Sequence, residues 1–275
     1  MFKRPEEGWK QFKKPTKTGD VSVLLGRANE QSNEADNKQK ILDTIKTLEA
    51  VLEIDPYNYD ALSSLGGLYW FVGAAYSDNK EEKKECYLAS YKCNEQAMYT
   101  NPEFKDLVDK GAKVSEACRV LSEREMAPMF YWYGAGGSYW VECLNWASKL
   151  ISLVGSKEYK RVLDRMLEID PTWDGGRPYI ARATFYATLP KLMGGDLKKA
   201  EELLDKAVEA GPNWLHSRLA RAKFLWTKTK DREAFKKDLE WILAQDPRKV
   251  DTSYAGSVYL QREAKEMLEN IDEYF

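Results

Sequence analysis

Hydrophobic residues recur every three to four positions along almost the whole chain, which is the spacing of amphipathic helices. No run of alternating apolar and polar residues lies between turn signals, so the pattern indicates no strand. We therefore predict an all-α fold. The predicted helices span residues 20–33, 37–54, 58–77, 80–100, 103–126, 128–153, 156–169, 175–193, 196–210, 213–229, 231–245 and 255–273.

Prolines at regular intervals punctuate this helical pattern. They end the stretches LEIDP, MYTNP, LEIDP, VEAGP and LAQDP, at Pro56, Pro102, Pro171, Pro212 and Pro247. Each proline stops the helix before it, because its ring removes a backbone donor and clashes with the preceding turn. The spacing of the last three is typical of helical-hairpin repeats.

The segment before Pro212 shows the repeat unit most clearly. Asp196 can cap a helix on which Ala200, Leu204 and Ala207 share one face, which is the tetratricopeptide pattern of small, large and small residues. Other segments keep the large residue but replace the small ones, so the repeats are degenerate.

We therefore expect stacked antiparallel helical hairpins in a degenerate tetratricopeptide-like superhelix. Two longer central helices, 103–126 and 128–153, should interrupt the stack, because the chain between Pro102 and Pro171 exceeds one repeat. The predicted organisation is an N-terminal extension over 1–19 without fixed structure and a single all-α domain over 20–275.

The charge and the scarce metal ligands exclude several classes of function. The net charge is −2, so the basic surface of a nucleic-acid-binding protein is missing. His216 is the single histidine, and we expect it to be a surface or helix-packing residue. The cysteines Cys86, Cys93, Cys118 and Cys143 form no CxxC motif, and burial as small apolar residues is favoured over disulfide pairing with a neighbouring helix. We expect no metal and no cofactor.

The stretch PMFYWYGAGGSYWVECLNWA at 128–147 contains a glycine-rich step within a predicted helix. A dinucleotide or phosphate loop is excluded, because no strand precedes the step and the remaining motif residues are absent. Three glycines in a helix cost about 1 kcal/mol each relative to alanine. Two explanations stay open: close approach of a neighbouring helix over Gly134 and Gly137, or the wall of a ligand cavity.

Aromatic residues around this step suggest either a core seam or the lining of a tunnel. Trp132, Tyr139 and Trp146 recur every seven residues, and a second aromatic group follows at 170–196 with Arg177, which can hold a carboxylate or form a surface ion pair. The residues expected to line a tunnel are Tyr131, Trp132, Gly134, Gly137, Tyr139, Trp140, Arg177, Tyr179 and Tyr186. Replacing Gly137 with leucine should then block it.

Several of these motifs resemble a known family. The stretch APMFYWYGAGGSYWVECLNWASKL, the D-GG-P element at 174–178, the LP-x-L-x-GGD turn at 189–196 and the ending DEYF are similar to the T-component family of tripartite ATP-independent periplasmic (TRAP) transporters. The likeness extends from about residue 40 to the end and is strongest over 127–230. It implies an all-helical, tetratricopeptide-like periplasmic protein, often lipid-anchored, that associates with the solute-binding subunit and contains a hydrophobic tunnel.

The leading hypothesis is therefore a non-enzymatic accessory subunit that binds the solute-binding protein and an apolar or amphipathic small molecule. Association of identical chains stays open.

The alternative is a cytosolic tetratricopeptide-type scaffold that binds peptide segments, for which Asn58, Arg177 and Arg218 are the candidate groove residues. The start, MFKRPEEGWKQFKK, contains no apolar region of the signal-peptide type, so either a cytosolic protein or a chain lacking its leader is expected. Catalysis has weak candidates only, in Glu116, Glu123 and Glu142.

Overall fold

The computed structural model describes residues 7–144 and 156–275 of the chain. Helices and connecting turns make up these residues, and no strand occurs among them, so the predicted all-α fold is confirmed. The chain divides into two compact units, Met1–Ile169 and Asp170–Phe275. The tetratricopeptide-like superhelix and the single domain over 20–275 stay predictions.

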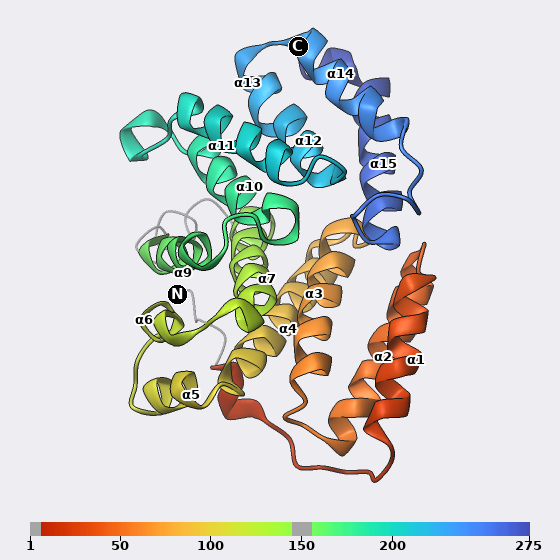
Figure 1. Ribbon diagram of the computed structural model, residues 1–275, viewed down its shortest axis with the longest axis vertical. Helices are drawn as coiled ribbons and strands as arrows, with labels where there is room; N and C mark the ends of the chain where they lie inside the picture. Colours follow the sequence, from red (N-terminus) through yellow and green to blue (C-terminus); the bar gives the residue numbers. More distant parts are fainter. Residues whose placement is uncertain (1–6, 145–155) are drawn as a thin grey trace. The chain divides into compact units, whose positions relative to one another are not determined.

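The first unit is built around two helical hairpins followed by α7 and α9. Its elements are η1 (Gly8–Gln11), α1 (Val21–Asn33), α2 (Lys38–Ile54), α3 (Tyr59–Ala75), α4 (Lys80–Tyr99), α5 (Pro102–Asp109), α6 (Val114–Ala117), η2 (Cys118–Val120), η3 (Glu123–Glu125), α7 (Met126–Ser138), η4 (Tyr139–Cys143) and α9 (Ser156–Ile169). Each of α1 to α4 packs on the next, so these helices lie side by side (Figure 1). Helix α7 packs against α3, α4 and α9, and so it joins the second hairpin to α9.

Side-chain caps and prolines set most of the helix boundaries, as the sequence predicts. In eight helices the side chain of the N-cap residue accepts a hydrogen bond from a backbone N–H of the first turn. These N-cap residues are Asp20, Asn37, Asn58, Asn79, Asn101, Asp196, Asp231 and Ser253. Helices α2, α9 and α11 (Leu197–Ala210) each end two residues before a proline.

The predicted long helix over 103–126 is wrong, because α5 ends at Asp109. Gly111 has a φ of 93°, which a glycine adopts without a steric penalty. The N–H of Gly111 binds the Val108 carbonyl at 3.0 Å, and that of Ala112 binds the Leu107 carbonyl at 3.0 Å. These two bonds form a Schellman motif, which closes the helix. Short helical turns occupy the rest of the predicted range.

The predicted helix over 128–153 is also shorter than expected. Helix α7 passes into a π-helical turn, η4, and Leu144 is extended, with φ −93° and ψ 146°. The remainder of the predicted range lies outside the described residues. The two longer central helices are therefore replaced by a series of short ones over 102–125 and by the 13-residue helix α7 with its π-turn.

Part of the N-terminal extension packs on the first unit. Trp9 is buried, stacks on Tyr99 with ring centroids 6.5 Å apart and meets Phe104 edge-on at 6.4 Å. The N–H of Gly8 donates to the buried Glu95 carboxylate at 2.6 Å. A single tryptophan and one charge-assisted hydrogen bond thus attach residues 8–11 to α4 and α5.

The second unit begins with the kinked helix α10. Its elements are α10 (Trp173–Thr188), η6 (Lys191–Met193), α11, α12 (Leu215–Arg221), η7 (Ala222–Trp226), α13 (Thr227–Thr229), α14 (Arg232–Leu243), α15 (Tyr254–Glu269) and η8 (Ile271–Glu273). Asp174, Gly175 and Gly176 are left-handed, so regular helix starts near Arg177 and ends at Thr188 rather than at the predicted 193.

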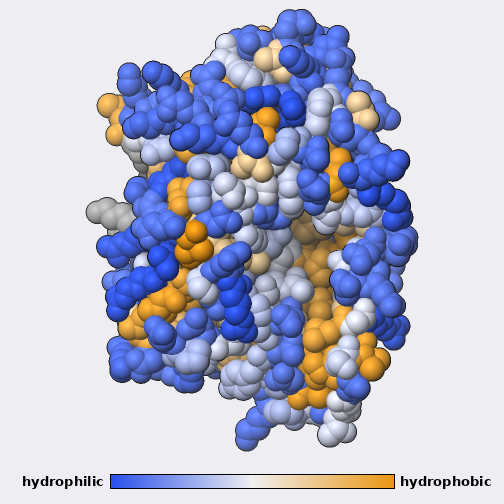
Figure 2. All heavy atoms as spheres, viewed as in Figure 1, coloured by the Kyte–Doolittle hydropathy of each residue, from blue (hydrophilic) through white to orange (hydrophobic). Residues whose placement is uncertain are grey.

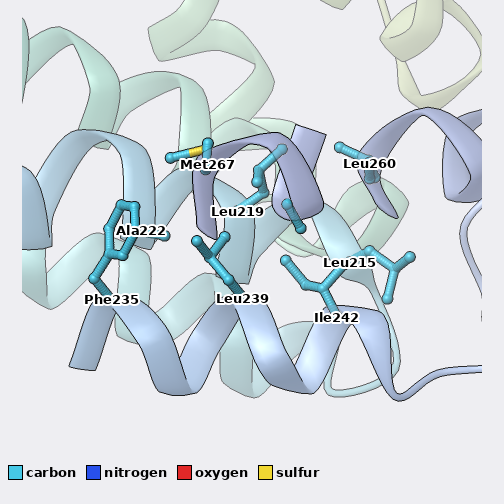
Figure 3. Close-up of a cluster of buried hydrophobic side chains, with 9 residues drawn as sticks. Leu215, Leu219, Ala222, Phe235, Leu239, Ile242, Leu260 and Met267 are labelled. Carbon is cyan, nitrogen blue, oxygen red and sulfur yellow. The ribbon is translucent and has the colours of Figure 1, made fainter. Parts of the chain in front are cut away.

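Two apolar clusters hold this unit together. The cluster in Figure 3 joins α12, η7, α14 and α15 through Leu215, Leu219, Ala222, Phe235, Leu239, Ile242, Leu260, Ala264 and Met267. The other joins α10 and α11 to the middle of the unit. It contains Ala200 and Leu204, and these residues and Ala207 are fully buried, which confirms the predicted face of α11.

A buried carboxylate adds a polar link across the second unit. Asp238 on α14 is only 2% exposed. It accepts hydrogen bonds from Arg218 at 3.1 Å, from two nitrogens of Arg221 at 2.7 and 2.8 Å, and from the Trp226 indole at 2.8 Å. Arg221 also binds the exposed Asp205 at 2.9 Å.

Replacing Asp238 with alanine should destabilise the protein by about 3–5 kcal/mol, because it leaves two partly buried guanidinium groups without their shared acceptor. Chemical denaturation measures this change. The matched control is Asp205→Ala, which removes an exposed partner of Arg221 and should cost less than about 1 kcal/mol. Equal losses from the two variants would contradict a special role for the buried carboxylate.

Candidate functional site

Two aromatic rings lie on glycines where α3 meets α7. A Cβ placed on Gly67 of α3 would lie 3.0 Å from the Tyr131 ring, and one on Gly134 of α7 would lie 3.3 Å from the Trp70 indole. The two rings are 5.7 Å apart, and the Trp70 N–H donates to Ser138 Oγ at 3.3 Å. All five residues are half-buried. We call this set, Gly67, Trp70, Tyr131, Gly134 and Ser138, the α3–α7 aromatic face.

Helix α3 extends this face with uncharged surface. Asp60 is its only charged residue, and Leu68, Phe71, Ala74 and Ala75 are half-buried. A helix that is apolar all round is normally enclosed on all sides. Figure 2 shows hydrophobic residues gathered over α1, α2 and α3 on the visible face of the first unit. The aromatic face therefore continues into an apolar, partly exposed helix.

Trp132, one of the residues predicted to line a tunnel, is buried among aromatic rings of the first unit. It is 2% exposed and lies between the rings of Tyr91 and Tyr159, each 5.0 Å away. Its indole N–H donates to the buried Glu95 carboxylate at 3.1 Å. The same carboxylate accepts the Gly8 N–H, so Trp132 connects α7 to α4 and to the N-terminal extension.

The glycine-rich step serves mainly to admit aromatic rings. A Cβ on the buried Gly136 would lie 2.3 Å from the Tyr159 ring of α9, whereas Gly137 is exposed and no atom lies within 4 Å of such a Cβ. Close approach at Gly134 and Gly137 was one of the two explanations left open by the sequence, and the structure shows close contacts at Gly134 and Gly136. Gly67, Trp70 and Gly136 were not predicted, although the GGLYW stretch at 66–70 repeats the combination of glycine and aromatic residues.

Tyr139 is half-buried in the π-turn. The side chain of Trp140, and Trp146 as a whole, lie outside the described residues.

Alanine at Gly136 and at Gly137 should have opposite effects on stability. Gly136→Ala places a methyl group against the Tyr159 ring and should destabilise the protein by about 1–3 kcal/mol. Gly137→Ala adds a better helix former in open space and should stabilise it by up to about 1 kcal/mol. Thermal unfolding of the two variants distinguishes them, and destabilisation by both would contradict the open surroundings of Gly137.

In the second unit, Arg177 is held by side chains of its own chain. Its guanidinium lies 2.6 Å from an Asp174 carboxylate oxygen and 2.9 Å from Nε2 of His216. Because arginine only donates, Nε2 must accept this bond, which places the proton of the neutral ring on Nδ1. The bend at 174–176 orients these groups. A Cβ on Gly175, whose φ is 70°, would collide with the Trp214 ring at 2.3 Å.

The environment of this cluster changes two pKa values. Burial, and then the Arg177 cation, lower the pKa of His216 well below 6.5. Burial raises the pKa of Asp174, and Arg177 opposes part of that rise. His216 is therefore neutral at pH 7 and acts as a hydrogen-bond partner.

The remaining predicted residues of this unit, Tyr179 and Tyr186, are half-buried. Lys199 lies 5.7 Å from the centre of the Tyr186 ring. The structure thus groups Tyr131 and Gly134 in the first unit and Arg177 with Asp174 and His216 in the second. That all nine predicted residues line one tunnel stays a prediction.

His216 should titrate with a midpoint below 6.5, as measured from its imidazole Cε1–H signal by NMR, which is unambiguous in a chain with one histidine. As pH falls below 6.5, the unfolded state binds the proton first, so stability is lost through this window. In His216→Gln this part of the pH dependence should disappear. A midpoint at or above 6.5 would contradict the environment described.

Groups suited to catalysis are not prominent. The four cysteines are free thiols, and burial raises the pKa of Cys93 to about 12 and that of Cys118 to about 11, which disfavours the nucleophilic thiolate. Glu142 is bound to Lys83 at 2.6 Å and to the Tyr87 hydroxyl at 2.9 Å. Within 7–144 and 156–275, no group of three or more histidine, cysteine or acidic side chains could hold a metal ion.

Fold and site together define an all-helical protein with an apolar aromatic face on its first unit. The sequence model of the TRAP transporter T-component family matches residues 38–275. The chain therefore belongs to the T-component family of TRAP transporters and is a transporter accessory subunit, as its motifs predicted. No curated protein matches it significantly. Among the described helices, none has the length and apolar character needed to cross a bilayer.

Proposed function

We propose that this chain is a non-enzymatic periplasmic subunit that binds the solute-binding protein of its transporter and holds an apolar or amphipathic small molecule on the α3–α7 aromatic face. Family membership supports the association with a transporter. The ligand part rests on one observation: Trp70 and Tyr131 are only half-buried although both contact a glycine of the facing helix.

Such a surface suits a ligand with an apolar body and a polar end. Ring faces bury apolar groups, and the Tyr131 hydroxyl is a polar group at the same place. The uncharged surface of α3 extends the apolar part along the helix. The proposed lining is therefore centred on Trp70, Tyr131 and Gly134, with Trp132 behind it in the core.

The peptide-binding scaffold receives no support from its candidate residues. Asn58 caps α3 by accepting the Ala61 N–H at 3.1 Å. Arg218 binds Asp238, and Arg177 binds Asp174. Side chains that are already bound within the chain are poor groups for gripping a peptide.

Native mass spectrometry of the chain mixed with the solute-binding protein of its transporter should show a discrete complex. With the apolar probe N-phenyl-1-naphthylamine, the chain should bind and enhance its fluorescence. Trp70→Ala and Tyr131→Ala should each weaken this binding by about 10-fold, since each removes most of one ring contact.

The control variant is Tyr57→Ala, which removes a 55% exposed aromatic ring elsewhere in the first unit and should leave probe binding unchanged. Circular dichroism verifies that each variant is folded. Unchanged probe binding in both aromatic-face variants would contradict the proposed ligand site. Absence of a complex with the solute-binding protein in native mass spectrometry would contradict the proposed partner.

A further inference from the structure

A short projecting segment of the second unit points to a function separate from the aromatic face. Residues 189–196, between α10 and α11, form a turn that we call the apolar hook (Figure 1). Three backbone hydrogen bonds fix it: Gly194 N–H to the Lys191 carbonyl at 3.1 Å, Gly195 N–H to the Pro190 carbonyl at 3.1 Å, and Asp196 N–H to the Tyr186 carbonyl at 3.0 Å.

Two glycines allow the hook to close. Gly194 has a φ of 95°, which a residue with a side chain rarely adopts. A Cβ on Gly195 would lie 1.9 Å from the Leu189 carbonyl oxygen, so only glycine fits there. The hook is therefore a defined turn, closed at its base and specified by the sequence.

The hook presents apolar side chains directly to solvent. Leu192 is 101% exposed, the largest value among the large exposed hydrophobic residues, and Leu197, just after the hook, is 40% exposed. Figure 2 shows hydrophobic atoms at the outer end of this segment. Exposed leucines are ordinary when scattered, but here the turn holds Leu192 outward at its apex.

Basic side chains surround these leucines. Lys191, Lys198 and Lys199 are all exposed. Lys199 lies 3.6 Å from Asp196, whereas Lys191 and Lys198 make no ion pair within the described part of the chain. The next acidic residues, at 201 and 202, lie about one helical turn farther along α11.

This combination fits a lipid surface better than a protein partner. A stable protein interface needs roughly 800 Å² from each partner, far more than a turn of this size offers, and lysine and leucine are under-represented at protein contact centres. Apolar side chains flanked by lysines are typical of segments that lie in the headgroup region of anionic bilayers.

We propose that the apolar hook binds an anionic bilayer, with Leu192 entering the headgroup region and Lys191 and Lys198 near the lipid phosphates. The contact is peripheral and reversible. Screening by salt weakens the lysine contribution, so binding falls as ionic strength rises.

Co-sedimentation of the whole chain with vesicles tests this proposal. Vesicles containing phosphatidylglycerol should bind the chain at low salt, and vesicles of phosphatidylcholine alone should bind it far less. Leu192→Ser should weaken binding about 10-fold, and Lys191→Glu about 5-fold or more. The matched control is Leu243→Ser, which changes a 39% exposed leucine on α14 and should have no effect.

Three outcomes would overturn the proposal. The first is wild-type protein that binds no vesicle, and the second is vesicle binding that Leu192→Ser leaves unchanged. The third is a Leu192→Ser variant that still binds vesicles but no longer self-associates or no longer forms the complex with the solute-binding protein. That result would mean that the hook contacts a protein. Probe binding to the α3–α7 aromatic face is independent of each of these results.

Discussion

The packing of the first unit depends on aromatic rings that lie directly on helix backbone where a side chain is missing. Tyr131 lies on Gly67, Trp70 on Gly134, and Tyr159 on Gly136. Each glycine destabilises a helix by about 1 kcal/mol relative to alanine, while burying an aromatic side chain stabilises the fold by about 1.5–3 kcal/mol. Placing a ring on a glycine is therefore favourable on balance. The same contacts bring α7 close to α3 and to α9, and they offset the cost of two of its three glycines, Gly134 and Gly136.

In the second unit a buried charge has the corresponding structural role. Asp238 accepts hydrogen bonds from side chains of α12 and η7, which directs two arginines inward and links α14 to both elements. This use of arginine has a functional consequence, because guanidinium groups engaged within the chain cannot recognise an acidic partner. Lys191 in the hook and Lys198 just after it make no ion pair within the described residues, and lysine attracts an anionic surface as a point charge rather than through a fixed bidentate contact.

Local signals predicted the helices well where capping residues and prolines coincide, as they do at Asp196 and Pro212. The stop at Gly111 was missed because helical periodicity continues past it, although lysine followed by glycine is itself a termination signal. The partners of the glycines could not be predicted, since Trp70 and Tyr159 lie far away in the sequence. Periodicity alone also cannot tell that Gly136 meets a ring and Gly137 does not, because this depends on where α9 lies.

The geometry of α7 explains why two neighbouring aromatic residues of the predicted lining have different surroundings. Successive residues of an α-helix point about 100° apart, so Tyr131 and Trp132 face different neighbours. Trp132 lies on the side of α7 that packs against α4 and α9. The side that faces α3 carries Tyr131, Gly134 and Ser138, at intervals of three and four residues. The contacts with α3 identify the side of α7 that carries half-exposed rings, whereas the side that carries Trp132 is a filled core. The proposed ligand would therefore lie on the side that faces α3.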